Sequence, residues 1–177
     1  VAGGHAECVK RILDEAALSQ ADAIIVNHID PNKQAPIHVS SVTGNLGVLE
    51  LLLLHGADLR RVDATGGTCL HSAVYGDNTD CLAYLLDNGG AVLMDEGDQK
   101  GNRPLHMCGQ LNRMAAAKLL LETCADAGLL NLAGQSPHDV AVKAGHKMVA
   151  DLIFQFAPAP SPAKKLKSPQ PTAQAPP

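Results

Sequence analysis

The chain has 177 residues, of which 46% are apolar, enough for a packed core, but only 2% are aromatic. A core of Leu, Ala, Val and Ile suits stacked short helices better than the core of a globular enzyme. The formal net charge of −4 argues against a general nucleic-acid binder, because phosphate contacts need a basic face.

The cysteine content and hydropathy point to the interior of a cell. The number of cysteines, 5, is odd and no Cys-x-x-Cys pair occurs, which favours reduced thiols over a disulfide framework. No run of about 18 uncharged apolar residues occurs, so we expect no membrane insertion, and we expect no signal peptide. We expect an intracellular, cytoplasmic location, with a nuclear one left open. The chain starts at Val1 rather than at Met, which leaves open whether it is a fragment.

One four-residue phrase recurs along the chain. It reads Ala-Pro-Ile-His at residues 35–38, Thr-Cys-Leu-His at 68–71, Arg-Pro-Leu-His at 103–106 and Ser-Pro-His-Asp at 136–139. A nearly constant spacing of about 33 to 35 residues is typical of a stacked repeat array.

Each repeat carries the same helix signals after its phrase. An apolar pair lies 14 and 15 residues after the last residue of the phrase, with another small or apolar residue three positions earlier, which predicts the buried stripe of a second helix. Ile153 and Phe154 are the last such pair. Six residues after the phrase comes a residue that tolerates the left-handed backbone, where a helix ends and the chain turns back: Gly44, Asp77, Asn112 and Gly145.

These residues resemble the ankyrin repeat family, whose phrase is Asp-x-x-Gly-x-Thr-Pro-Leu-His, followed by Ala-Ala-x-x-Gly-His and Leu-Leu-x-x-Gly-Ala-Asp. The phrase is seen at residues 63–71 and 98–106, and its last part at 53–58. The resemblance covers about residues 3–156. It implies an all-α fold, an ankyrin-type solenoid of stacked helix-turn-helix units joined by extended hairpin-like connectors.

The units divide the chain into one repeat domain and a tail. We expect the domain over residues 1–157, with a partial unit at 1–29, full units at 30–62, 63–97 and 98–130, and a C-terminal cap at 131–157. The apolar run 23–26 is expected to pack back on the stack. The Pro/Ala/Lys-rich residues 158–177 predict a disordered tail. Whether Ser161 or Ser168, each followed by Pro, is modified stays open.

The recurring residues His38, His71 and His106 invite a catalytic or metal-binding interpretation, but their recurrence favours a structural one. Each unit must be linked to its neighbour, and an imidazole can bond backbone groups of its own unit and the next. Pro104 and Pro137 fit the first helical turn, where the amide has no intrahelical acceptor. Neither Ala35 nor Arg103 can cap a helix as Thr does, so Arg103→Thr is expected to stabilise the domain.

No combination of residues indicates catalysis or cofactor binding. The chain has no His-x-x-x-His pair, no Gly-x-Ser-x-Gly elbow and no Gly-x-x-x-x-Gly-Lys phosphate loop. Cys8 and Cys81 align with apolar residues of the second-helix stripe, which favours core positions over nucleophiles. His138 and His146 are interpreted as surface or packing residues. We therefore expect a chain that is not an enzyme, with no metal and no cofactor.

The resemblance also implies where a partner would bind. Ankyrin arrays bind proteins in a concave groove made by connector tips and the first-helix face beside them. Tyr75 is the natural anchor, because interface hot spots favour Tyr and Arg. Carried onto this chain, the candidate positions are Asn32, Gln34, Val42, Thr43, Thr65, Tyr75, Gln99, Lys100, Asn102, Gln110, Leu111 and Gln135, with Gly67, Ala133 and Lys143 at equivalent places and Arg60 and Arg61 adjacent.

The function so implied is a non-catalytic protein–protein interaction scaffold, a monomer that binds a protein partner and neither nucleic acid nor membrane. Its rigid surface would lose little ordering entropy on binding. The alternative is a regulatory module of a larger multidomain signalling enzyme, docked on a neighbouring domain. Residues 148–156 keep it open, because a terminal repeat should have a polar outer face and Leu152 and Phe156 would be partly exposed.

Overall fold

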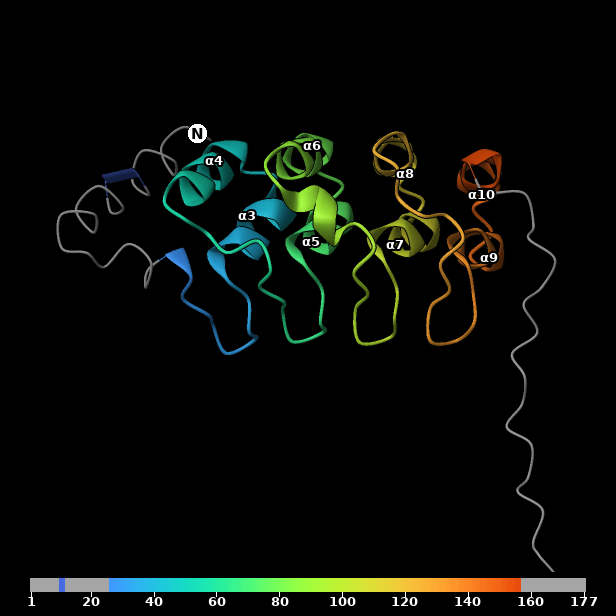
Figure 1. Ribbon diagram of the computed structural model, residues 1–177, viewed down its shortest axis with the longest axis horizontal. Coiled ribbons are helices and arrows are strands. Elements are labelled where there is room, and N and C mark those ends of the chain that lie inside the picture. Colours follow the sequence, from blue (N-terminus) through green and yellow to red (C-terminus); the bar gives the residue numbers. More distant parts are fainter. Residues whose placement is uncertain (1–9, 12–25, 157–177) are drawn as a thin grey trace, which may run out of the picture.

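The computed structural model describes residues 10–11 and 26–156, and within them the chain forms helix pairs joined by long connectors (Figure 1). Most of the expected first unit and all of the expected tail at 158–177 lie outside the described residues. The pairs are α3 (Pro36–Thr43) with α4 (Leu46–Leu54), α5 (Cys69–Tyr75) with α6 (Thr79–Asp87), α7 (Pro104–Leu111) with α8 (Met114–Glu122), and α9 (Pro137–Lys143) with α10 (Lys147–Phe156); the short 3-10 helix η1 (Gly90–Leu93) follows α6.

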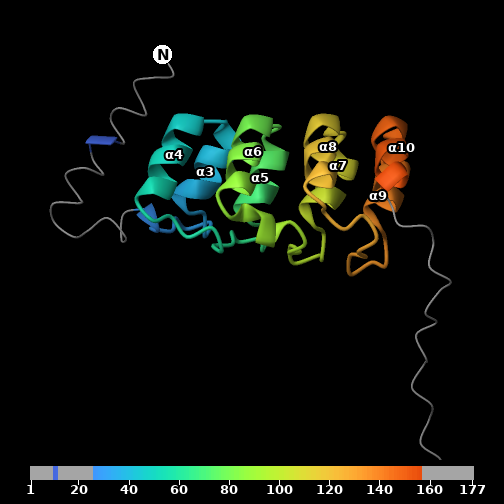
Figure 2. The same cartoon turned by 45° about the horizontal axis from the view of Figure 1, so that its top comes forward.

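The helices lie in two rows. The first helices of the pairs, α3, α5, α7 and α9, pack against one another in chain order, and the second helices, α4, α6, α8 and α10, form the row above them (Figure 1). The connectors project from the lower side of the first row, and Figure 2 shows the pairs standing side by side. The predicted all-α solenoid is therefore confirmed.

The turn inside each pair follows from its sequence. All four residues predicted at the turn have the left-handed backbone conformation, with φ of 73° at Gly44, 59° at Asp77, 60° at Asn112 and 80° at Gly145. Gly, Asn and Asp tolerate this region better than other residues. The second helix can then run back along the first, which is how each unit buries two apolar stripes.

The core is aliphatic, as the low aromatic content predicts. Leu70, Leu82, Leu85, Leu105 and Leu120 have no more than 1% of their surface exposed. Three thiols are also buried, and burial raises the pKa of the Cys69 thiol to about 12 and that of Cys108 still further. Thiols in this state are inert as nucleophiles. Cys124 is exposed, and Cys8 lies outside the described residues.

The two ends of the described stack differ. At the start, Val26 is fully buried against Leu52, whereas the rest of the apolar run 23–26 lies outside the described residues. At the end, Ile153 is buried but Phe154 is 66% exposed, so the prediction that this pair forms a buried stripe is wrong for Phe154. Of the equivalent residues, each followed by another helix pair, Leu86 and Leu121 are buried and Leu53 is half-buried. Within the described part of the chain, no helix combines the length and apolarity that crossing a bilayer requires.

Candidate functional site

Four five-residue turns at the ends of the connectors, here called the fingertips, share one hydrogen-bond pattern. They are residues 30–34, 63–67, 98–102 and 131–135. In each, Oδ1 of the opening Asp or Asn accepts bonds from the backbone N–H groups two and four residues later, at 2.8–3.0 Å. Its own N–H donates to the carbonyl of the fifth residue. Such Asx turns hold the backbone of each fingertip in one shape.

Neighbouring fingertips are also joined to one another through their backbones. The N–H of Ala64 donates to Asn32 O at 3.1 Å, that of Gln99 to Thr65 O at 2.9 Å, and that of Leu132 to Lys100 O at 3.0 Å. The row leaves no room for a side chain at Gly101, where a Cβ would lie 2.8 Å from the Leu132 amide nitrogen. The fingertips therefore form a continuous rigid edge.

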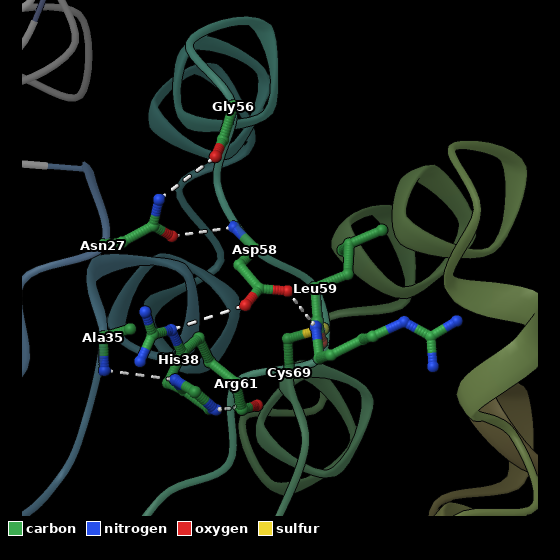
Figure 3. A network of polar contacts seen from close by, with 9 residues as sticks. Asn27, Ala35, His38, Gly56, Asp58, Leu59, Arg61 and Cys69 are labelled. Carbon is green, nitrogen blue, oxygen red and sulfur yellow. Dashed lines mark hydrogen bonds and ion pairs between the residues drawn. The ribbon is translucent and has the colours of Figure 1, made fainter. Parts of the chain in front are cut away.

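The three repeated histidines link each helix pair to the following connector. Each ring is nearly fully buried, accepts a bond at Nδ1 from the backbone N–H three residues earlier, and donates from Nε2 to a carbonyl of the connector that follows its helix pair (Figure 3 shows His38). Because one nitrogen faces a donor and the other an acceptor, the neutral ring protonated on Nε2 fits both partners. His38 accepts from the Ala35 N–H at 3.2 Å and donates to Arg61 O at 3.0 Å. His71 accepts from the Thr68 N–H at 3.1 Å and donates to Asn102 O at 2.9 Å. His106 accepts from the Arg103 N–H at 3.2 Å and donates to Gln135 O at 3.0 Å.

A second set of links joins each unit to the preceding one, and the sequence interpretation missed it. The residue at the start of the second helix donates from its side chain to a carbonyl at the end of the preceding first helix. Asn78 donates to Val42 O at 2.7 Å, Arg113 to Tyr75 O at 3.1 Å, and His146 from Nδ1 to Gly109 O at 3.0 Å. The donor residues are of three different types, so only their equivalent position in the repeat could have revealed these links from the sequence.

Arg103 also has a structural role that the sequence did not reveal. Its guanidinium donates to the carbonyls of Asp95, Gly101 and Leu130, at 3.2, 2.7 and 2.6 Å, and so joins two connectors. The N–H of Arg103 itself is already satisfied by His106. A capping Thr at this position would therefore lose more than it gains, and the expectation that Arg103→Thr stabilises the domain is revised.

We now expect Arg103→Thr to lower the free energy of unfolding by about 1 kcal/mol, because charge-assisted bonds to three carbonyls are lost. Arg103→Lys, which keeps the charge but not the planar fork, should lose less. Urea denaturation of the three proteins measures the difference. A Thr variant as stable as the wild type would show that the three bonds add no net stability, and a more stable one would restore the original expectation.

The buried histidines should make the stability of the domain depend on pH. Burial lowers the pKa of His38, His71 and His106 below the ordinary value of 6.5. As pH falls through 6.5, the unfolded chain therefore takes up protons that the folded chain does not, and stability falls. Hydrogen bonds from Ser136 lower the pKa of Asp139, but its contribution is lost only below 3.8, in a separate window.

Urea unfolding between about pH 7.5 and about pH 5.5 tests this expectation. The free energy of unfolding should decrease steadily toward the acidic end. A constant free energy across this range would show that the three rings bind protons equally well in the folded and unfolded chains.

Two adjoining hollows lie between the fingertips and the first-helix row, and together they are called here the fingertip groove. The first has a volume of about 610 Å³ and the second of about 660 Å³. Gln99, Lys100, Asn102 and Gln110 line both, so the hollows are continuous. The first also contains Gln34, Val42, Asp63, Thr65, Gly67, His71, Ser72, Tyr75, Asp98, Met107 and Leu111, and the second Asn131, Leu132, Ala133, Gln135, Val140, Lys143 and Ala144.

The groove thus gathers most of the candidate residues proposed from the sequence. Tyr75 is 62% exposed on its wall, and Met107, which the sequence interpretation did not include, lines the same hollow. Asn32, Thr43, Arg60 and Arg61 line neither hollow.

Arg61 belongs to a separate polar network at the end of α4 (Figure 3). Its Nε lies 3.5 Å from Asp58 Oδ2, and Asn27 bonds both the Asp58 N–H and the Gly56 carbonyl, at 2.8 and 3.1 Å. The backbone carbonyl of Arg61 accepts the bond from His38 Nε2. Arg61 therefore contacts the connector after α4 and His38 of α3 rather than the groove.

The groove carries no arrangement for metal chemistry. Within residues 10–11 and 26–156, no three His, Cys, Asp or Glu side chains are grouped so that they could hold a metal ion. His71, which lines the first hollow, has both ring nitrogens occupied by structural bonds. What the groove offers is exposed amide, aliphatic and aromatic surface on a rigid frame.

Comparison with known proteins places the repeats in a family. A family model described as ankyrin repeats (3 copies) matches residues 1–96 and 52–129. The chain is 32% identical over 121 residues, 68% of its length, to the "Transient receptor potential cation channel subfamily A member 1 homolog" of Caenorhabditis elegans, and covers 10% of that protein. It is 39% identical over 61 residues, 34% of its length, to the "Notch-regulated ankyrin repeat-containing protein" of Xenopus tropicalis, covering 54% of it.

A longer but weaker similarity extends over most of the chain. It is 25% identical over 148 residues, 84% of the chain, to the "Tyrosine-protein kinase HTK16" of Hydra vulgaris, and covers 19% of that protein. The chain therefore spans less than two thirds of each of these relatives.

Proposed function

The chain belongs to the ankyrin repeat family, whose repeats generally mediate protein–protein interaction, and we propose from this that it is a non-catalytic scaffold that binds a protein partner in the fingertip groove. The observation that carries the proposal is the wall of the groove. Tyr75 is 62% exposed there, beside the aliphatic residues Val42 and Leu111. Tyr is one of the residue types enriched at interface hot spots, and the aliphatic side chains in the same hollow offer further contact surface.

The rigidity of the frame supports the same proposal. Fingertips joined by backbone hydrogen bonds and helices linked by buried histidines hold the groove in one shape before a partner arrives. Binding to a preorganised surface costs less ordering entropy, so a modest contact area can give useful affinity. The buried reduced thiols Cys69, Cys81 and Cys108 support a location inside the cell, which is also a proposal.

Quantitative affinity capture followed by mass spectrometry tests the proposed surface. The wild type is compared with a groove variant, Tyr75→Ala with Gln110→Ala, and with a control variant, Glu50→Ala with Asp87→Ala, whose changes lie on α4 and α6 outside the groove. We expect the groove variant to lose at least one partner that the wild type and the control both retain. Equal recovery of all partners by the three proteins would place the binding surface elsewhere.

A further inference from the structure

The two hollows of the fingertip groove differ in charge. Lys100 and Lys143 line the second hollow, and none of the described carboxylates lines it. Among the described residues, neither lysine has a carboxylate oxygen within ion-pair distance. The whole chain has a formal net charge of −4, so this hollow is a basic site on an acidic protein. It attracts negative charge that the rest of the surface repels.

The first hollow shares Lys100 with the second, but carboxylates outnumber lysines in its lining. The carboxylates of Asp63 and Asp98 line it, together with the exposed ring of Tyr75 and the apolar side chains of Leu111 and Met107. Two backbone amides already bond Oδ1 of each Asp, but the negative charges remain. An acidic residue of a partner would be repelled here, whereas an aliphatic or aromatic one would find contact surface.

The side chains between the two ends suit an extended segment. Gln110 lines both hollows and Gln135 the second, and neither side-chain amide makes a hydrogen bond within the described residues. A primary amide can both donate and accept, so these groups match the alternating N–H and C=O of a partner backbone. The groove thus combines an apolar end, a polar middle and a basic end.

We infer that the fingertip groove recognises an extended acidic peptide segment, with an aliphatic or aromatic side chain against Tyr75 and a carboxylate side chain between Lys100 and Lys143. This inference rests on the proposed function, and adds to it the chemistry of the bound segment and the order of its side chains along the groove. That order follows from charge, because the opposite order would place the carboxylate beside Asp63 and Asp98.

Selection from a random-peptide phage library supplies a defined probe. The full chain is the target, and it is compared with Lys100→Glu/Lys143→Glu in the groove and with Lys118→Glu/Lys147→Glu on α8 and α10. The two double variants change the net charge equally, and all four lysines are exposed, so both should fold. One enriched peptide is then measured against each protein by fluorescence anisotropy, alongside the same peptide with its acidic residues changed to amides.

We expect wild-type selection to enrich peptides that carry Asp or Glu beside an apolar residue. Reversing the charges of Lys100 and Lys143 should raise the dissociation constant of such a peptide at least about tenfold, because two attractions become repulsions. The dissociation constant for the control variant should stay within about twofold of the wild-type value. The amide peptide should bind the wild type and the groove variant alike.

The outcomes separate this inference from the proposed function. Peptides that lose affinity on Tyr75→Ala/Gln110→Ala but show no acidic preference, or no response to the charge reversal, would overturn the inference and leave the proposed function standing. Two outcomes would overturn both the inference and the proposed function: a library that yields no binders, or peptides that bind the Tyr75→Ala/Gln110→Ala variant and the wild type with equal affinity.

Discussion

His71→Ala is expected to lower the free energy of unfolding by about 3 kcal/mol. The ring is 3% exposed, accepts bonds from the Thr68 N–H and hydroxyl at 3.1 and 3.0 Å, and donates to Asn102 O at 2.9 Å. Its removal leaves a buried backbone N–H without a partner and opens a cavity between two units. Both effects carry large costs in packed cores.

Urea denaturation at about pH 7.5, where the rings are neutral, measures this loss without the pH effect. The control is His28→Ala, which removes an exposed histidine and should change stability by no more than about 0.5 kcal/mol. If the His71 and His28 variants were equally stable, the repeated histidine would not link the units, and its recurrence would need another explanation.

Gly109→Ala is expected to destabilise the domain by about 2 kcal/mol, although Ala is the better helix former. Gly109 is buried in α7, and a Cβ there would lie 2.7 Å from Pro137 O and 3.1 Å from Ala141 Cβ, both on α9. The added methyl group would push α9 away from α7. It would also disturb the bond from His146 to the Gly109 carbonyl.

Thermal or urea unfolding of Gly109→Ala gives the sign directly. Ala115→Gly at an exposed position of α8 calibrates intrinsic helix propensity and should cost about 1 kcal/mol. Propensity alone predicts that Gly109→Ala gains a similar amount. A more stable Gly109→Ala variant would therefore contradict the close packing of α7 against α9.

The fold could be predicted from the sequence because its determinants are local. A residue that tolerates positive φ, such as Asn112, ends the first helix, and an apolar stripe marks the second. The repeat register also placed candidates such as Tyr75, Gln99 and Gln110 along one line, and the structure brings them into one groove. Their part in binding stays a prediction, as does the alternative that the chain is a regulatory module of a larger signalling enzyme.

What could not be predicted depends on contacts between units. Arg103 and Arg113 donate to backbone carbonyls, and since every residue has a carbonyl, no sequence signal identifies the acceptor. The charge difference between the hollows was missed for a similar reason. Lys100 and Lys143 come from different repeats, and only stacking brings them to one site. The exposure of Phe154 likewise depends on what packs beyond α10.

Amide chemical-shift mapping by NMR tests most directly the central claim that the fingertip groove binds the partner. The probe is a peptide enriched from the library, added to the uniformly labelled full chain. The largest shifts should fall on the fingertips 63–67, 98–102 and 131–135 and on α5 and α7, with small shifts on α4, α6 and α8. Largest shifts on the second-helix row, or around the exposed Phe154 and Phe156 of α10, would contradict it.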